Sequence, residues 1–289
     1  MDAAAEAVKG LEIRRWKLSG WKGLNPPRHA EGDWGVTFPD VHFVRLFLRA
    51  FPTLRNNGWR TTAHDGRATY LLGWDDHDIE KIRAFFELLS TCVAISDQTN
   101  GSFALDYNFR PDQAVNGTLI RTAIGETVLA AKPYNSPATE GSYQAAAILA
   151  TCMAEFVAVN PVLHDIHGIV AVPPSNPLSD YQLPAILARR IAEHRDLPFY
   201  ENAVRRVLPT PSIKNLARAE KLNALSGSIQ VDEGLRGRRL LLIDDLYQSG
   251  ITLNYVAALL RNAGAEAVFG LTAVKTMRND DNLVREEDR

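Results

Sequence analysis

One segment near the C-terminus constrains the fold of this chain more than any other. Its four consecutive apolar residues, Leu240–Ile243, come directly before two adjacent carboxylates, Asp244 and Asp245. A continuous apolar run of this length is typical of a strand that is buried on both faces of a parallel sheet. The apolar spacing then predicts a helix over 252–262 and another strand over 267–274. The segment therefore predicts a strand–helix–strand unit whose ligand binds where the first strand ends.

Short apolar runs alternate with longer helical patterns from about residue 127 onward, which is typical of a parallel sheet covered by helices. Along the whole chain, apolar spacing predicts helices over 41–51, 78–92, 142–158 and 181–193. The remaining extended segments are predicted over 127–131, 168–172 and 199–208.

The chain also changes composition along its length. All five tryptophans fall within the first 74 residues, and the second half contains none. We therefore expect two structural units and a tail. They are a tryptophan-containing N-terminal segment of unknown type over 1–117, an α/β domain over 118–277 and a polar tail over 278–289.

The overall charge is nearly balanced, with 32 Lys and Arg against 34 Asp and Glu in 289 residues. Because nucleic-acid binding draws on an excess of basic residues, nucleic acid is an unfavoured partner. Two cysteines cannot form a disulfide framework, and the N-terminus lacks the apolar core of an export signal. Uninterrupted apolar runs are far shorter than the roughly 20 residues of a membrane span. We expect a cytoplasmic protein that does not associate with a membrane.

The loop that follows the paired carboxylates has the features of a phosphate cradle. It consists of Tyr247, Gln248, Ser249, Gly250, Ile251 and Thr252. The helix that begins here offers unpaired N–H groups and the positive end of its dipole, Gly250 allows close approach of the backbone, and the Ser249 and Thr252 hydroxyls add donors. Carboxylates would repel a phosphate bound directly on them, so we expect them to hold the hydroxyls of an attached ribose, with Mg²⁺ nearby. The predicted ligand is a ribose 5-phosphate unit.

Other readings of this segment fit less well. A P-loop requires a lysine that this loop does not contain, and the GxGxxG of a dinucleotide-binding strand is absent. A receiver domain also opens with an acidic pair after an apolar strand, but too little chain follows Asp245 to supply its remaining units. A structural alternative is that Asp244 only caps the helix. The complete string of strand, acidic pair, SGxT and helix disfavours that alternative.

The string LLLIDDLYQSGITL resembles the motif with which type I phosphoribosyltransferases bind 5-phosphoribosyl-1-pyrophosphate (PRPP), and its surroundings resemble the ComF-like members. The resemblance runs from about residue 127 to 276 and includes AAKPY at 130–134, VAVPPSNPL at 170–178, YQLPAILARRIA at 181–192 and TPSIKNLARAEKLNAL at 210–225. It implies a parallel-sheet, Rossmann-like phosphoribosyltransferase domain. The implied activity is transfer of a 5-phosphoribosyl group from PRPP to a nitrogen acceptor, with release of pyrophosphate and with Mg²⁺ bound alongside PRPP.

The resemblance also implies a role for individual residues. Asp244 and Asp245 would hold the 2- and 3-hydroxyls of the ribose, and residues 248–252 would bind its 5-phosphate. Arg218 and Lys221 would belong to a loop that closes over the reacting centre. The turn that would contact pyrophosphate consists of Pro173, Pro174, Ser175 and Asn176.

The chain departs from the family in ways that leave two functions open. Gln248 stands where the family usually has threonine, the N-terminal cysteine module is missing, and PPSNPLSDYQ lacks the arginines of ComF-like proteins. Fewer cations would weaken the binding of pyrophosphate and of the charge that develops as it leaves. The chain is therefore either a transferase or a non-catalytic module that senses PRPP or a nucleotide and acts with a protein or nucleic-acid partner. A protein partner would dock on the N-terminal segment, and a homodimer is a reasonable expectation.

Two further patterns carry less weight. His164 and His167 are too few for a metal site, and we expect them in a surface turn, with no metal site built from protein side chains. The stretch 14–22 interleaves basic residues with Trp16 and Trp21. Such a stretch can stack on bases, but amphipathic aromatic residues more often pack against another protein surface.

Overall fold

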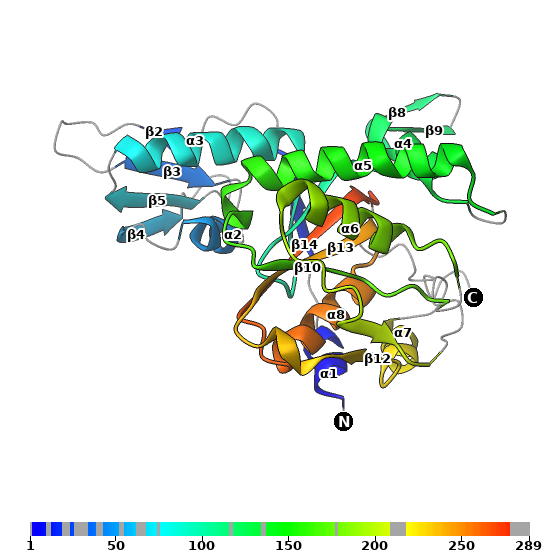
Figure 1. Ribbon diagram of the computed structural model, residues 1–289. Coiled ribbons are helices and arrows are strands. Elements are labelled where there is room, and N and C mark those ends of the chain that lie inside the picture. Colours follow the sequence, from blue (N-terminus) through cyan, green and yellow to red (C-terminus); the bar gives the residue numbers. More distant parts are fainter. Residues whose placement is uncertain are drawn as a thin grey trace, which may run out of the picture.

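The computed structural model describes residues 2–9, 13–18, 24–25, 34–38, 43–51, 55–61, 68–73, 76–115, 118–133, 137–176, 179–208 and 218–277. The helices drawn in Figure 1 are α1 (Ala3–Lys9), α2 (Phe43–Ala50), α3 (Asp76–Thr91), α4 (Ala123–Ala131), α5 (Glu140–Val159), α6 (Leu183–Arg195), α7 (Arg218–Leu225) and α8 (Ile251–Asn262). The first seven strands are β1 (Arg14–Trp16), β2 (Leu24–Asn25), β3 (Trp34–Phe38), β4 (Arg55–Thr61), β5 (Ala68–Gly73), β6 (Val93–Ser96) and β7 (Ser102–Tyr107). The others are β8 (Phe109–Val115), β9 (Thr118–Arg121), β10 (Gly168–Ala171), β11 (Val204–Arg206), β12 (Ile229–Val231), β13 (Arg239–Tyr247) and β14 (Ala267–Lys275).

A six-stranded sheet forms the centre of the molecule, in the order β1-β6-β7-β14-β13-β10 (Figure 1). The strands β7, β14, β13 and β10 run parallel to one another. The strands β6 and β1 extend this sheet with antiparallel pairing at one edge. The predicted α/β fold with a mostly parallel sheet is confirmed.

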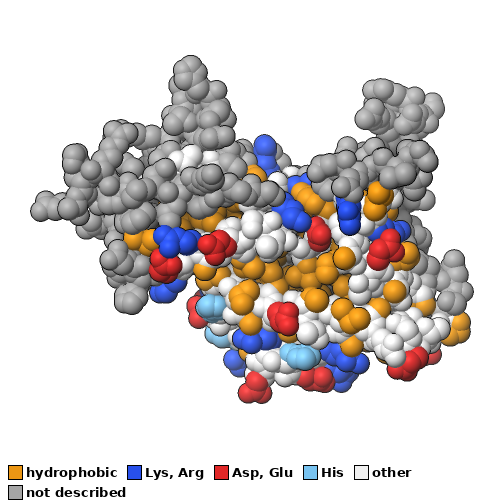
Figure 2. All heavy atoms as spheres, turned by 90° about the horizontal axis from the view of Figure 1, so that it is seen from above, with side chains coloured by type: hydrophobic (Ala, Val, Ile, Leu, Met, Phe, Trp, Pro, Cys, Tyr) orange, Lys and Arg blue, Asp and Glu red, His pale blue; other side chains and the backbone are white. Residues whose placement is uncertain are grey.

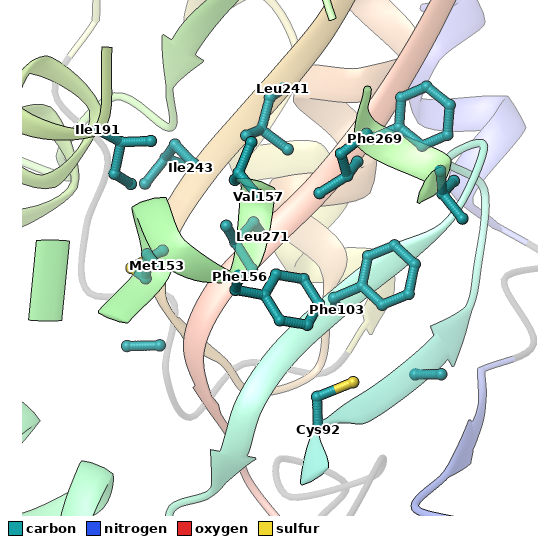
Figure 3. Packing of buried hydrophobic residues seen from close by; sticks show 14 of the residues in the cluster. Cys92, Phe103, Met153, Phe156, Val157, Ile191, Leu241, Ile243, Phe269 and Leu271 are labelled. Atoms are coloured by element: carbon teal, nitrogen blue, oxygen red, sulfur yellow. The ribbon is translucent and has the colours of Figure 1, made fainter. Parts of the chain in front are cut away.

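The central strand β13 contributes to a separate apolar core on each face of the sheet. Leu241 and Ile243 pack on one face beneath α5 and α6, whereas Leu240 and Leu242 pack on the other face with α8. In the first core, shown in Figure 3, Leu241 and Ile243 lie close to side chains of α5 and α6 such as Ile191. This alternation explains the continuous apolar run, because a strand covered on both sides has no face that needs polar residues.

The N-terminal residues form a second, antiparallel sheet in the order β2-β3-β5-β4. Beside it, α2 and α3 contribute phenylalanines to a cluster of aromatic rings that includes Phe38 and Phe86. Trp16 is buried in the same cluster, with its ring edge-on to that of Phe43 at a centroid distance of 5.1 Å. Trp16 therefore packs within the core, while Trp21 lies outside the described residues.

Most predicted helices and strands occur where the apolar spacing indicated, but the strand predicted over 127–131 is wrong. These residues form the second half of α4. The helix begins after Thr122, whose side chain accepts a hydrogen bond from the amide of Gly125 at 3.0 Å. Val128 and Ala131 are buried three residues apart. A short apolar run fits a strand as well as a helix, and periodicity alone cannot distinguish the two. Here the N-cap and the burial of one helix face favour the helix. Within 199–208, Phe199 forms an isolated parallel bridge with Ile169, and Val204–Arg206 form β11, which pairs with β12.

Strands from both sides of residue 118 share the central sheet, since β1, β6 and β7 come before that position. Phe103 of β7 lies against Phe156 of α5, with ring centroids 5.5 Å apart. The division expected between 1–117 and 118–277 thus runs through one hydrogen-bonded sheet. The expected polar tail over 278–289 lies outside the described residues.

The helix α5 is apolar over most of its length. A window of 18 residues within it has a mean hydropathy of 1.4, so length and composition alone would allow it to cross a membrane, in contrast to the expectation from uninterrupted runs. Half of that window is buried in the fold. Ile148 and Val159 of this helix are 56% and 60% exposed. In the view from above, apolar side chains at the surface are interrupted by charged groups (Figure 2).

The contact between Phe103 and Phe156 yields a test of the shared sheet. Replacement Phe103→Ala is expected to lower the free energy of unfolding by about 3–5 kcal/mol, because it leaves a cavity in a fully buried core. Urea unfolding followed by circular dichroism measures this loss. A loss below about 1 kcal/mol would mean that β7 is not an integral strand of the domain.

Candidate functional site

Two loops that the sequence separates by about 70 residues meet at the carboxyl edge of the sheet. β10 pairs with β13 so that Ala171 lies beside Ile243, and the amide of Val172 donates to the carbonyl of Ile243 at 2.9 Å. The turn 173–176 therefore emerges next to Asp244 and Asp245. Parallel pairing thus brings together the predicted pyrophosphate turn and the predicted ribose-binding carboxylates.

A cleft with two lobes lies around the acidic pair. The larger lobe has a volume of about 780 Å³ and the smaller about 440 Å³. We call the smaller one the phosphate lobe, because the loop 248–252 lines it, and the larger one the tyrosine lobe, because Tyr143 and Tyr181 line it. The residues shared by both lobes are Lys132, Pro173, Ser175, Asn176, Asp244 and Asp245. The acidic pair thus borders both lobes.

The phosphate lobe is closed at one end by the start of α8. Gly250 precedes the first helical residue, and its φ of +69° lies in the left-handed region. A Cβ atom at this position would lie 2.3 Å from the hydroxyl oxygen of Tyr247. Glycine is therefore required both by the backbone conformation and by the ring beneath it. Gln248, Ser249, Ile251 and Thr252 line the lobe around this turn.

Tyr247 contributes to the site from below the loop. Its side chain is 1% exposed, and its hydroxyl donates to Oδ2 of Asp97 at 2.8 Å. Burial, and then the neighbouring Asp97 carboxylate, raise the pKa of the Tyr247 hydroxyl well above its ordinary value. This side chain is the floor of the predicted phosphate-binding loop, and its hydroxyl stays protonated.

Burial changes the titration of Asp244, the first carboxylate of the pair. Burial, and then the charge of the adjacent Asp245, raise the pKa of Asp244 well above its ordinary value, while Lys132 opposes this shift. The amide of Asp245 donates to Oδ1 of Asp244 at 2.9 Å. Asp245 is 5% exposed and forms an ion pair with the ammonium group of Lys132. The pair combines an ion-paired carboxylate with one that ionises reluctantly, an arrangement that is frequent at functional sites.

Cations reach the cleft from segments far from the turn 173–176. Lys132 follows α4, Arg206 ends β11, and Lys221 lies in α7. Nε of Arg206 donates to the carbonyl of Pro174 at 2.6 Å, and burial lowers the pKa of this guanidinium. Lys221 is 2% exposed and lines the phosphate lobe. Basic side chains thus reach the cleft from other elements, although PPSNPLSDYQ contains none.

Sequence reasoning assigned a role to Lys221 but missed Lys132 and Arg206. The only sequence feature that pointed to Lys132 was its presence in AAKPY. No sequence feature pointed to Arg206, because this strand residue comes near the turn 173–176 only in the folded chain. Arg218 begins α7, and its side chain lies outside what the structure describes.

The tyrosine lobe has aromatic walls. The rings of Tyr143 and Tyr181 meet edge to face with centroids 5.2 Å apart. The Tyr181 hydroxyl donates to the carbonyl of Ala131 at 2.6 Å, and burial raises the pKa of this hydroxyl to about 12. Tyr181 is therefore a fixed donor, while the ring of Tyr143 is 42% exposed and open to a flat ligand.

The histidines predicted in a surface turn lie just before β10. Nδ1 of His167 accepts a hydrogen bond from the amide of Arg239 at 3.2 Å. Within the described ranges, no three His, Cys, Asp or Glu side chains gather as a metal site would require. Cys92 is buried and Cys152 half-buried, and both are free thiols.

Comparison with known proteins supports the nature of this site. The profile of the phosphoribosyl transferase domain matches residues 186–283, which contain β13, the loop and α8. Competence protein F of Haemophilus influenzae is 30% identical over 92 residues, which amount to 30% of this chain and 40% of that protein. The match therefore spans less than half the length of this relative.

Solved structures overlap with about half of the chain at low similarity. A hypothetical protein from Neisseria gonorrhoeae with bound ppGpp is 15% identical, with a TM-score of 0.32 over 50% of this chain and 74% of that one. Purine phosphoribosyltransferase from Pyrococcus horikoshii is also 15% identical, with a TM-score of 0.30 over 49% of this chain and 87% of that one. The family assignment rests on the sequence matches. By these matches, residues 186–283 carry the phosphoribosyl transferase domain, and part of the chain is similar to a ComF protein.

Proposed function

We propose that the chain binds PRPP in the two-lobed cleft and transfers its 5-phosphoribosyl group to a nitrogen acceptor, releasing pyrophosphate. The observation that carries the proposal is the position of Asp244 and Asp245 beside a helix that begins at a left-handed glycine. An anion fits at the helix start and hydroxyls fit at the carboxylates. A ribose 5-phosphate carries both a phosphate and ring hydroxyls, and these groups are separated by about the width of one sugar.

The charges along the cleft indicate how PRPP would lie. Its 5-phosphate would occupy the loop 248–252, and its ribose hydroxyls would contact Asp244 and Asp245. The pyrophosphate would then lie near the turn 173–176, within reach of Lys132, which borders both lobes. Arg206, held against the carbonyl of Pro174, would add positive charge at this turn, and the buried Lys221 would add positive charge in the phosphate lobe.

The proposed reaction needs no covalent intermediate with the protein. The bond between the anomeric carbon and the pyrophosphate oxygen breaks, its electron pair leaves with pyrophosphate, and positive charge develops on the ribose. The acceptor nitrogen supplies the electron pair of the new bond and then loses its proton. Carboxylates beside the ribose and cations beside the leaving group stabilise this separation of charge, and closure of the cleft against water prevents hydrolysis.

The site has the donor set that Mg²⁺ requires. Magnesium prefers oxygen ligands and usually keeps several waters, with one or two carboxylates and the substrate phosphates. Asp244 and Asp245 are the carboxylates that border both lobes, and they would hold the ion together with PRPP. When bound, Mg²⁺ would neutralise part of the charge on pyrophosphate.

A second candidate function is a module that binds PRPP or a nucleotide without turnover. The observation that favours it is the absence of basic residues in PPSNPLSDYQ. Binding of a ligand in the cleft would then change how the chain interacts with a partner protein or with a second copy of itself. The N-terminal strands could take part, since β6 and β7 belong to the same sheet as the site.

Pyrophosphate release distinguishes the two functions. Protein incubated with Mg²⁺, PRPP and a panel of nitrogenous bases is expected to release pyrophosphate with at least one acceptor, measured by a coupled phosphatase assay. Asp245→Asn is expected to reduce the rate about tenfold or more, because it removes a charged contact to the ribose. Calorimetric binding of PRPP without release across the panel would support the sensing module, and absence of both would refute the proposed site.

Arg206 and its neighbour Arg205 offer a matched pair of variants. Arg206 is buried at the turn 173–176, whereas Arg205 is exposed and forms an ion pair with Asp232. Arg206→Met is expected to weaken PRPP binding about tenfold while changing ribose 5-phosphate binding less, since only PRPP carries pyrophosphate. Arg205→Met should change neither dissociation constant. Equal weakening of both ligands by Arg206→Met would show that this arginine does not interact with pyrophosphate.

The raised pKa of Asp244 predicts that this carboxylate destabilises the empty protein at neutral pH. A carboxyl group that ionises less readily in the folded than in the unfolded chain lowers the free energy of unfolding as the pH rises above its ordinary pKa. Asp244→Asn is therefore expected to raise the melting temperature by about 2–4 °C at pH 7. The difference from the unmodified protein should vanish near pH 3.5. A variant that is less stable at pH 7 would contradict this assignment.

A further inference from the structure

A turn of the N-terminal half reaches the start of α8. This turn, between β6 and β7, carries Asp97, whose Oδ2 accepts from the Tyr247 hydroxyl at 2.8 Å and from Nδ2 of Asn254 at 3.3 Å. The amide of Gln98 donates to Oδ1 of Asn254 at 2.9 Å. Ser102 also donates to Asp97, at 2.9 Å. The segment is thus joined to the floor of the phosphate lobe by a cluster of hydrogen bonds.

The carbonyls of the phosphate loop are held on the inner side of this loop. The carbonyl of Gly250 accepts from the amide of Asn254 at 2.9 Å and from its Nδ2 at 2.8 Å. The carbonyl of Gln248 accepts from the buried ammonium group of Lys275 at 3.2 Å. The carbonyl of Tyr247 accepts from the amide of Thr276 at 3.0 Å. Three carbonyls of this short turn are therefore bonded to groups behind it.

This arrangement determines where the amides of the loop point. In a trans peptide the N–H and C=O of one plane point in opposite directions, and the described residues contain no cis peptide. When the carbonyls of Gln248 and Gly250 face inward, the amides of Ser249 and Ile251 face outward. Both residues line the phosphate lobe. The groups behind the loop thus aim its donors at the position expected for the phosphate.

We propose that Asp97 is a positioning residue for phosphate binding, acting through Tyr247 and Asn254. Asp97 anchors the Tyr247 hydroxyl, which also accepts from Nδ2 of Asn254 at 3.1 Å. The ring of Tyr247 lies directly beneath Gly250, so a shift of the ring shifts the turn. Because donors that are already oriented lose less entropy on binding, this frame raises the affinity for phosphate. The inference rests on the proposed function, and it extends the site to a residue outside the matched range 186–283.

Two buried tyrosines provide a matched test. Tyr247→Phe removes the hydroxyl that Asp97 anchors, and Tyr255→Phe removes the hydroxyl of another buried tyrosine, which donates to Asp2. Calorimetric titration with inorganic phosphate and with ribose 5-phosphate measures binding, and thermal unfolding measures stability. Both variants are expected to lose stability, but only Tyr247→Phe should weaken both ligands, by about tenfold.

A double-mutant cycle separates positioning from a merely structural effect. Asp97→Asn is expected to weaken phosphate binding by itself but to have a smaller effect in the Tyr247→Phe background, because the contact between Asp97 and Tyr247 is already lost there. Phosphate-induced shifts of the Ser249 and Ile251 amide resonances are expected to shrink in Tyr247→Phe and to persist in Tyr255→Phe.

The possible results point to different conclusions. If the unmodified protein binds ribose 5-phosphate and Tyr247→Phe binds it equally well, the role of Asp97 is refuted while the proposed function stands. Independent, additive effects of Asp97→Asn and Tyr247→Phe on affinity would likewise refute it. If the unmodified protein binds neither inorganic phosphate nor ribose 5-phosphate, the proposed function and the positioning role both fail.

Discussion

The parallel pairing of β13 with β10 on one side and β14 on the other is the interaction on which the rest of this structure depends. Its register places Ala171 beside Ile243 and Asp244 beside Thr272, so the loops after β10 and β13 leave the sheet at the same edge. The turn 173–176 lies beside the acidic pair for that reason, while the start of α8 follows the pair directly along the chain. Burial of alternate β13 side chains in two cores holds the strand in this register, because a slip of one residue would exchange its two faces.

The balance of charge in the cleft explains why its residues come from so many elements. Two adjacent carboxylates at a buried strand end are destabilising unless cations or hydrogen bonds compensate them. Lys132 pairs with Asp245, while Arg206 is held by a backbone carbonyl of the neighbouring turn. A core built for stability alone would not keep such groups together. The arrangement is therefore typical of a functional site and not of a stabilising core.

The elements with strong periodicity could be predicted, and the exceptions have physical causes. Helices α2, α3, α5 and α6 follow apolar spacings of three and four residues, and β13 follows its continuous apolar run. The apolar run at 127–131 is too short for its spacing to distinguish a strand from a helix. The cap formed by Thr122 stabilises the helix α4. The presence of β6 and β7 in the same sheet as β13 could not be predicted, because strand pairing depends on contacts between residues far apart in sequence.

The sequence by itself determined the chemical nature of the site, because the acidic pair, the glycine-containing turn and the helix start are contiguous and follow local rules of backbone geometry. Only the tertiary structure decided which side chains surround this motif. Lys132, Arg206 and Asp97 each arrive from another element, and Tyr247 lies beneath the loop it belongs to. Their positions result from packing between distant segments, and no local pattern encodes such packing.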